Sequence, residues 1–187
     1  DLDRSLECFL QQRTIYEELG YRAGLAAVVT NIAWIHQLRG EAERALELNL
    51  LSLTIREQVG DHRGLAGGLH NIGMVYAEHG RYSEAMEQYR KALRINQSIG
   101  NRQWAAYNVA AIGNIHLDLG EFDEAMQSYK QTLESCSELG DRSIAAMAVQ
   151  NMGAVHRQRQ EYASALECYQ KALEDYRAIG DPRSITE

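Results

Sequence analysis

The sequence predicts an all-α fold in which antiparallel helix pairs stack one after another. One observation behind this prediction is the composition, because a single proline stands against abundant alanine, leucine, glutamate and glutamine, which favour helices. A second is that glycines recur at a fixed spacing of forty residues, and periods of this length are typical of repeat architectures. With 187 residues, the chain is long enough for one sizeable core or an elongated array.

Two series of glycines mark where the predicted helices end. The first series recurs every forty residues at Gly20, Gly60, Gly100, Gly140 and Gly180. The second lies half a period later at Gly40, Gly80 and Gly120, and Gln160 interrupts it. The residues after four first-series glycines are Asp61, Asn101, Asp141 and Asp181, the last followed by Pro182. A glycine past a helix end and then an N-capping residue is a stop-and-restart signal, so each period holds two helices of roughly 17 residues.

The elements follow from this period in chain order. Residues 1–20 match the second helix of a repeat, and residues 181–187 begin a further first helix. The full repeats are 21–60, 61–100, 101–140 and 141–180. Residues 1–187 therefore form a single array in this interpretation. Because arrays normally end in units with a polar outer face, we expect this chain to be a piece of a longer protein whose end helices can self-associate.

Equivalent positions of the repeats form columns that predict how the helices pack. On the first helix, a small residue occupies one column at Ala33, Gly73, Gly113 and Gly153. A larger side chain follows three residues later at His36, Tyr76, His116 and His156. The second helix has three columns, which are Ala45, Ala85, Ala125 and Ala165, then Asn49, Tyr89, Tyr129 and Tyr169, then Leu53, Leu93, Leu133 and Leu173. Small residues facing large ones predict closely packed antiparallel helices.

These columns resemble the tetratricopeptide repeat, in its forty-residue variety known from bacterial regulatory proteins and the Leu-Gly-Asn repeat protein. The matching residues of the second full repeat are Leu69, Ile72, Gly73, Tyr76, Ala85, Tyr89 and Ala92. Gln97 stands where the family's proline would be, as expected when the second helix is longer. The resemblance covers essentially the whole chain. It implies a right-handed α-α superhelix, a solenoid of antiparallel helix pairs whose first helices line the concave side.

Charge and cysteine content exclude several classes of function. The net charge is −7 and the isoelectric point is near 5.4, so we expect no nucleic-acid partner and no anionic membrane surface. No apolar run approaches the length of a membrane span. Cys8, Cys136 and Cys168 lie far apart and are odd in number, which favours a reducing compartment and a cytoplasmic location.

The sequence offers no catalytic constellation, and we predict a protein that is not an enzyme and needs no cofactor. The histidines of the His36 column are interpreted as core residues, since neighbours one repeat apart are too distant to share a metal ion. The segment 64–68, GLAGG, lacks the lysine and the preceding strand of a phosphate-binding loop. Cys8 and Cys168 share one helical phase, which indicates packing rather than reactivity.

The remaining candidate site is the concave face implied by the resemblance. Asn31, Asn71 and Asn151 share a column that Ala111 interrupts, and Asn114 lies nearly one turn beyond that gap. In some family members this column forms a ladder of amides that holds the backbone of an extended peptide, because an amide both donates and accepts. The alternative is that each asparagine bonds a neighbouring helix end or water. The other candidate peptide-binding residues are Trp34, His70, Met74, Tyr107, Gln150 and Arg157.

These observations favour a non-catalytic protein–protein interaction module within a larger scaffold or regulatory protein, with an extended partner peptide in its concave groove. One alternative is a structural spacer or oligomerisation module that self-associates through its end helices. Another is an enzyme or small-molecule sensor that uses the region of Trp34, His70, Met74 and Tyr107. Because the face carries no lysine, we expect no clamp for a C-terminal carboxylate.

Overall fold

A computed structural model describes residues 2–180, apart from the side chains of residues 138 and 139, and residues 2–180 contain nine helices and no strand. The all-α prediction is therefore confirmed. The predicted further helix at 181–187, with Asp181 and Pro182, lies outside the described residues. The helices are α1 (Leu2–Glu18), α2 (Arg22–Leu38), α3 (Ala42–Val59), α4 (His62–Glu78), α5 (Tyr82–Ser98), α6 (Arg102–Asp118), α7 (Phe122–Leu139), α8 (Arg142–Gln158) and α9 (Tyr162–Ile179).

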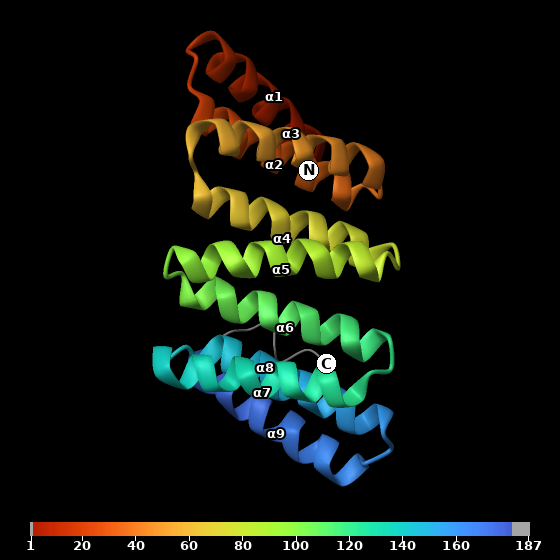
Figure 1. The fold of residues 1–187 in the computed structure, drawn as a ribbon. Coiled ribbons are helices and arrows are strands. Elements are labelled where there is room, and N and C mark those ends of the chain that lie inside the picture. Colours follow the sequence, from red (N-terminus) through yellow and green to blue (C-terminus); the bar gives the residue numbers. More distant parts are fainter. Residues whose placement is uncertain (1, 181–187) are drawn as a thin grey trace. The chain divides into compact units, whose positions relative to one another are not determined.

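The chain divides into two compact units, which are described separately. Unit 1 is Asp1–Ile99 and contains α1 to α5, and unit 2 is Gly100–Glu187 and contains α6 to α9. In unit 1, α2 packs on α3 and α4 on α5, while α1 covers α2 and α3 contacts α4 (Figure 1). In unit 2, α6 packs on α7, α7 on α8 and α8 on α9. The first helices also meet within each unit, α2 against α4 and α6 against α8.

The turns between helices are built as the glycine series predicts. Gly20, Gly60 and the other glycines of both series have positive φ angles, which close each helix through backbone hydrogen bonds. Gln160 adopts the same left-handed conformation, with φ of 62°, although it carries a side chain. The capping prediction is confirmed at Asp61 and Asp141, whose carboxylates accept hydrogen bonds from backbone N–H groups of the next turn. It is wrong at Asn101, whose side chain makes no cap hydrogen bond.

The small-residue column exists because an aromatic ring lies directly on it. A Cβ atom added to Gly73 would come within 2.7 Å of the ring of Tyr89. The same Cβ at Gly113 would meet Tyr129 at 2.9 Å, and at Gly153 it would meet Tyr169 at 2.8 Å. The first repeat carries Ala33 and Asn49 in these two columns, so the position that has a methyl group is paired with a smaller side chain. The predicted close approach of the helices is confirmed.

The histidine column is not core, which corrects the prediction. His36, His116 and His156 are 15%, 16% and 22% exposed, and each Nδ1 is 2.5–2.6 Å from the carboxylate of a glutamate five residues later. Those glutamates are Glu41, Glu121 and Glu161. Each pair joins the end of a first helix to the start of the second. The second repeat makes this junction differently, with the Arg81 guanidinium 4.4 Å from the centre of the Tyr76 ring.

Candidate peptide-binding face

Each unit presents candidate residues on its two adjoining first helices. In unit 1 they form a set on α2 and α4 that we call the unit 1 face, namely Asn31, Trp34, His70, Asn71 and Met74. In unit 2 they form a set on α6 and α8 that we call the unit 2 face, namely Tyr107, Asn114, Gln150, Asn151 and Arg157.

The two asparagines of the unit 1 face are available to a ligand. Asn31 is exposed and Asn71 is half-buried, and neither side chain makes a hydrogen bond within residues 2–180. The helices that carry them are held together by a hydrogen bond of 2.8 Å from Gln37 Nε2 to Glu78 Oε2. Both amides can therefore still donate and accept.

The apolar residues of the unit 1 face differ in exposure. Trp34 is 49% exposed, so about half of a large indole faces solvent, while Met74 is half-buried. The His70 ring lies against the buried ring of Tyr89, with 5.1 Å between the ring centres. Burial, and then the charge of Glu78, raise the pKa of the Tyr89 phenol to about 12. His70 is thus in contact with the core, whereas Trp34 is the exposed aromatic of this face.

In the unit 2 face, the structure joins two of the predicted asparagines directly. Asn151 Nδ2 donates a hydrogen bond of 3.0 Å to Asn114 Oδ1. The Tyr129 hydroxyl donates to the same oxygen at 2.7 Å. Burial, and then the charge of Asp118, raise the pKa of the Tyr129 phenol well above its ordinary value, so the hydroxyl keeps the proton it donates. Two hydrogen bonds, one from the core residue Tyr129 and one from Asn151, therefore fix the orientation of the Asn114 amide.

This arrangement determines which atoms of the pair remain for a ligand. The Asn114 oxygen already accepts two hydrogen bonds, which is its full capacity. The Asn114 Nδ2 and the Asn151 Oδ1 have no partner within the described residues. The pair thus presents one fixed donor group next to one fixed acceptor. Within the described chain, Asn114 and Asn151 bond each other rather than a neighbouring helix end.

The other three candidate residues of the unit 2 face differ in their contacts and exposure. Gln150 Oε1 accepts a hydrogen bond of 3.2 Å from the Tyr176 hydroxyl of α9. Tyr107 is half-buried against the cluster around Cys136 and Ile144, and burial raises the pKa of its phenol. The Arg157 side chain is exposed and makes no hydrogen bond or ion pair within residues 2–180, so it is not brought together with the asparagine pair.

Two second-helix tyrosines support the face, and the sequence analysis did not name them as site residues. Tyr129 holds Asn114, and Tyr176 holds Gln150. A signal for Tyr129 was present, since its column faces the first helix through Gly113 and its hydroxyl must find a partner when buried. Tyr176 has no such consistent column, because its equivalents are Tyr16, Arg56, Asn96 and Cys136.

Features that would indicate other kinds of site are absent from the described part of the chain. No group of three or more histidine, cysteine or acidic side chains there could hold a metal ion. None of the described helices has both the length and the apolar character needed to cross a membrane. Burial, and then the charge of Asp141, raise the pKa of the Cys136 thiol to about 11, which suppresses its reactivity.

Helix pairs that repeat every forty residues, with a small residue of one helix under an aromatic ring of the next, define a helical repeat protein of the α-solenoid class. The tetratricopeptide repeat family matches residues 35–98 and 105–184, which is more than half of the chain. The chain therefore belongs to the tetratricopeptide repeat family.

Comparison with solved structures gives the same fold. BtubC (BKLC) from P. vanneervenii matches with a TM-score of 0.81 at 21% identity, over 95% of this chain and 74% of that one. The apo form of RapI matches with a TM-score of 0.81 at 17% identity, over 98% of this chain and 51% of that one. A Rap protein complexed with Competence and Sporulation Factor matches with a TM-score of 0.81 at 15% identity, over 99% of this chain and 52% of that one. The chain thus spans about half the length of these Rap proteins. No curated protein sequence matched the chain.

Proposed function

We propose that this chain is a non-catalytic interaction module that binds an extended peptide segment of a partner protein on its first-helix faces. The observation that carries the proposal is the Asn114–Asn151 pair, whose bond of 3.0 Å leaves one donor group and one acceptor without a partner in the described chain. The concave surfaces of helical repeat proteins are their usual binding surfaces, and first helices line them in this family.

The chemistry of the pair matches a peptide backbone. An extended peptide presents N–H and C=O groups in alternation. The Asn114 amide donates to a peptide carbonyl, and the Asn151 oxygen accepts from a peptide N–H. On the unit 1 face, the Asn31 and Asn71 amides can each donate and accept a hydrogen bond. Because these contacts address the backbone, they tolerate many peptide sequences, and selectivity must come from the side chains around them.

The magnitudes require apolar anchors in addition to the amides. A net hydrogen bond contributes about 1 kcal/mol, whereas association costs at least about 4 kcal/mol in lost freedom. Trp34, of which 49% is exposed, is suited to cover an apolar peptide side chain, since buried aromatics dominate binding energetics. Met74 adds an adaptable contact on the next first helix. We therefore infer that peptides with an apolar residue bind the unit 1 face best.

Two further observations support a regulatory or scaffolding role. One similar fold is a Rap protein complexed with Competence and Sporulation Factor, and the present chain covers 52% of that protein. The three cysteines are unpaired, which agrees with a parent protein that works in the cytoplasm.

The proposal is tested with a peptide selected on the purified chain from a random library. Its affinity for the native chain is compared with that for Asn71→Ala/Asn151→Ala by calorimetry. We expect a loss of at least about tenfold, because one to two hydrogen bonds disappear at each site. Asn101→Ala is the matched control, since Asn101 makes no cap hydrogen bond and lies at a helix start. Equal affinity in the double variant and the control would overturn the proposal.

Self-association is a second candidate, and it is favoured by exposed apolar side chains on α9. Tyr162 is 66% exposed and Leu166 is 57% exposed, which is unusual for large apolar residues one helical turn apart. Light scattering over a range of concentrations tests it. A mass that rises with concentration in the native chain, and falls back in Leu166→Glu, would support self-association. A constant monomer mass would exclude it.

A further inference from the structure

Unit 1 holds a pocket of about 510 Å³ that is lined by residues of α1, α2 and α3. Its volume lies within the range of small-molecule sites. The floor is apolar and made of Leu25, Val29 and Ile55, all of which are buried. The rim is polar and includes Arg13 and Glu17 of α1 and Arg22 at the start of α2. This pocket, the α1–α3 pocket, involves none of the candidate peptide-binding residues.

Comparison with the other repeats shows what is unusual about this pocket. Arg13 occupies the column in which the other second helices carry Leu53, Leu93, Leu133 and Leu173. Leu53 is 9% exposed and packs in one cluster with Leu69 and Ile72, and the other three leucines are half-buried. At this place in unit 1, the leucine is replaced by a longer, charged side chain that is 33% exposed. A buried or half-buried apolar position of the other repeats is thus a cation on the wall of the pocket.

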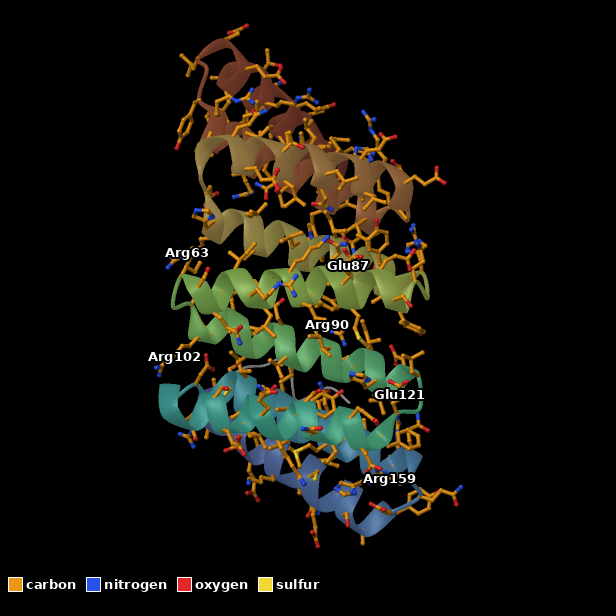
Figure 2. All side chains as sticks on the ribbon, viewed as in Figure 1. Arg63, Glu87, Arg90, Arg102, Glu121 and Arg159 are labelled. Carbon is orange, nitrogen blue, oxygen red and sulfur yellow. The ribbon has the colours of Figure 1, made fainter. Side chains whose placement is uncertain are left out.

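The opposite wall shows the reverse exchange. Leu51 lines the pocket and is 42% exposed, whereas its column carries Lys91, Gln131 and Lys171 in the later repeats. Its neighbour Leu50 is 48% exposed and corresponds to Arg90, which projects from α5 together with Glu87 (Figure 2). The second helix α3 therefore exposes leucines where α5 exposes charges. The two exchanges place an arginine and an exposed leucine on the walls of the α1–α3 pocket.

Arg13 and Arg22 both retain donor groups for a ligand. Arg13 uses Nε for a bond of 2.8 Å to Glu17, and within the described chain its other guanidinium nitrogens have no partner. Arg22 donates from one nitrogen to Gln58. The Arg13–Glu17 pair is a partly exposed pair one helical turn apart, which contributes only about 0.3–0.5 kcal/mol. A ligand carboxylate can therefore replace Glu17 at Arg13 at little cost.

We propose that the α1–α3 pocket binds a small aliphatic carboxylate, whose hydrocarbon chain lies on the Leu25, Val29 and Ile55 floor and whose carboxylate pairs with Arg13. The apolar floor favours a ligand with a hydrocarbon chain over a fully polar anion such as phosphate, and the arginines disfavour amines. The surroundings favour a ligand with a single negative charge, because Glu17 on the rim and the chain's net charge of −7 repel polyanions.

The test uses octanoate, with hexanoate and decanoate for the length dependence, titrated into the whole chain and followed by amide NMR shifts. Shifts are expected at α1, α2 and α3. Each two-carbon extension should tighten binding by up to about fifteenfold until the floor is covered, because each buried CH₂ adds about 0.8 kcal/mol. Octanol, which lacks the charge, should bind at least about tenfold more weakly than octanoate. No binding at millimolar octanoate, or equal binding of octanol, would overturn the proposal.

Two variants make the test specific, and both are expected to keep the fold. Arg13→Leu places the residue of the other repeats in this column, so it should fold at least as stably while octanoate affinity falls about tenfold or more. Glu17→Gln removes the competing carboxylate and should tighten octanoate binding severalfold. Arg4→Leu changes an exposed arginine of α1 that does not line the pocket and should leave affinity unchanged. Unaltered binding in Arg13→Leu, or weaker binding in Glu17→Gln, would contradict the proposed site.

Discussion

Replacing Gln160 with glycine should stabilise this protein. Gln160 sits in the turn between α8 and α9 with φ of 62°, whereas the equivalent Gly40, Gly80 and Gly120 have φ of 75°, 70° and 76°. The backbone hydrogen bonds of these turns are the same. The Gln160 N–H donates a hydrogen bond of 3.0 Å to the backbone carbonyl of Arg157, just as the Gly120 N–H donates one of 3.0 Å to the backbone carbonyl of Leu117. The Gln160 side chain is exposed, so the substitution changes little besides the backbone preference.

The size of the effect follows from two opposing terms. An L-residue in the left-handed region costs about 1–2 kcal/mol, which Gln160→Gly removes. Glycine in turn loses more backbone entropy on folding, at about 0.5–1 kcal/mol. The net expectation is a gain of about 0.5–1 kcal/mol in the free energy of unfolding. For a chain of 187 residues this corresponds to a rise of about 1–4 °C in Tm.

Urea unfolding followed by circular dichroism measures this change, with Gly120→Gln as the reciprocal variant in the same unit. Gly120→Gln should lose a similar amount, because it introduces the strain that Gln160→Gly relieves. Hydrogen exchange of the amides near each turn shows whether the change is local, as expected for a repeat protein. If Gln160→Gly is neutral or destabilising while Gly120→Gln costs nothing, left-handed strain does not explain the glycine series.

Three further predictions concern the packing and the site. Gly113→Ala should destabilise unit 2 by about 1–3 kcal/mol in urea unfolding, since the new Cβ would lie 2.9 Å from the Tyr129 ring, and a neutral result would contradict the close approach. Tyr129→Phe should cost about 0.5–1.5 kcal/mol and weaken peptide binding, because Asn114 loses the bond that orients it, and unchanged affinity would separate that bond from the site. At pH 8 a thiol reagent should react fast with the exposed Cys8 of the native chain and almost not at all with the buried Cys136. The Cys136 thiol has a pKa of about 11, so roughly one molecule in a thousand carries the reactive thiolate at this pH. Equal reaction rates of the two cysteines would refute this prediction.

Parts of the site could be anticipated from the sequence because they depend on periodicity. Asn31 and Asn71 share a column of the repeat, and within unit 1 the two helices that carry them, α2 and α4, contact each other. The partners of the amides could not be anticipated. Asn114 lies outside that column, and its bond to Asn151 depends on how α8 is placed against α6. The histidine column was misinterpreted as core for the same reason, since its glutamate partners lie across a turn whose geometry sets the distance.

The local structure and its repetition follow from the pattern of residues along the chain. Glycines where the chain must turn left-handed, small residues under aromatic rings, and apolar positions at helical spacing act within one repeat or between neighbours, so a period of forty residues specifies them. Which side chains meet depends instead on how the helices pack. The pairing of Asn114 with Asn151, and the pocket left where Arg13 stands in a leucine column, depend on distances between separate helices, and no pattern along the chain encodes these directly.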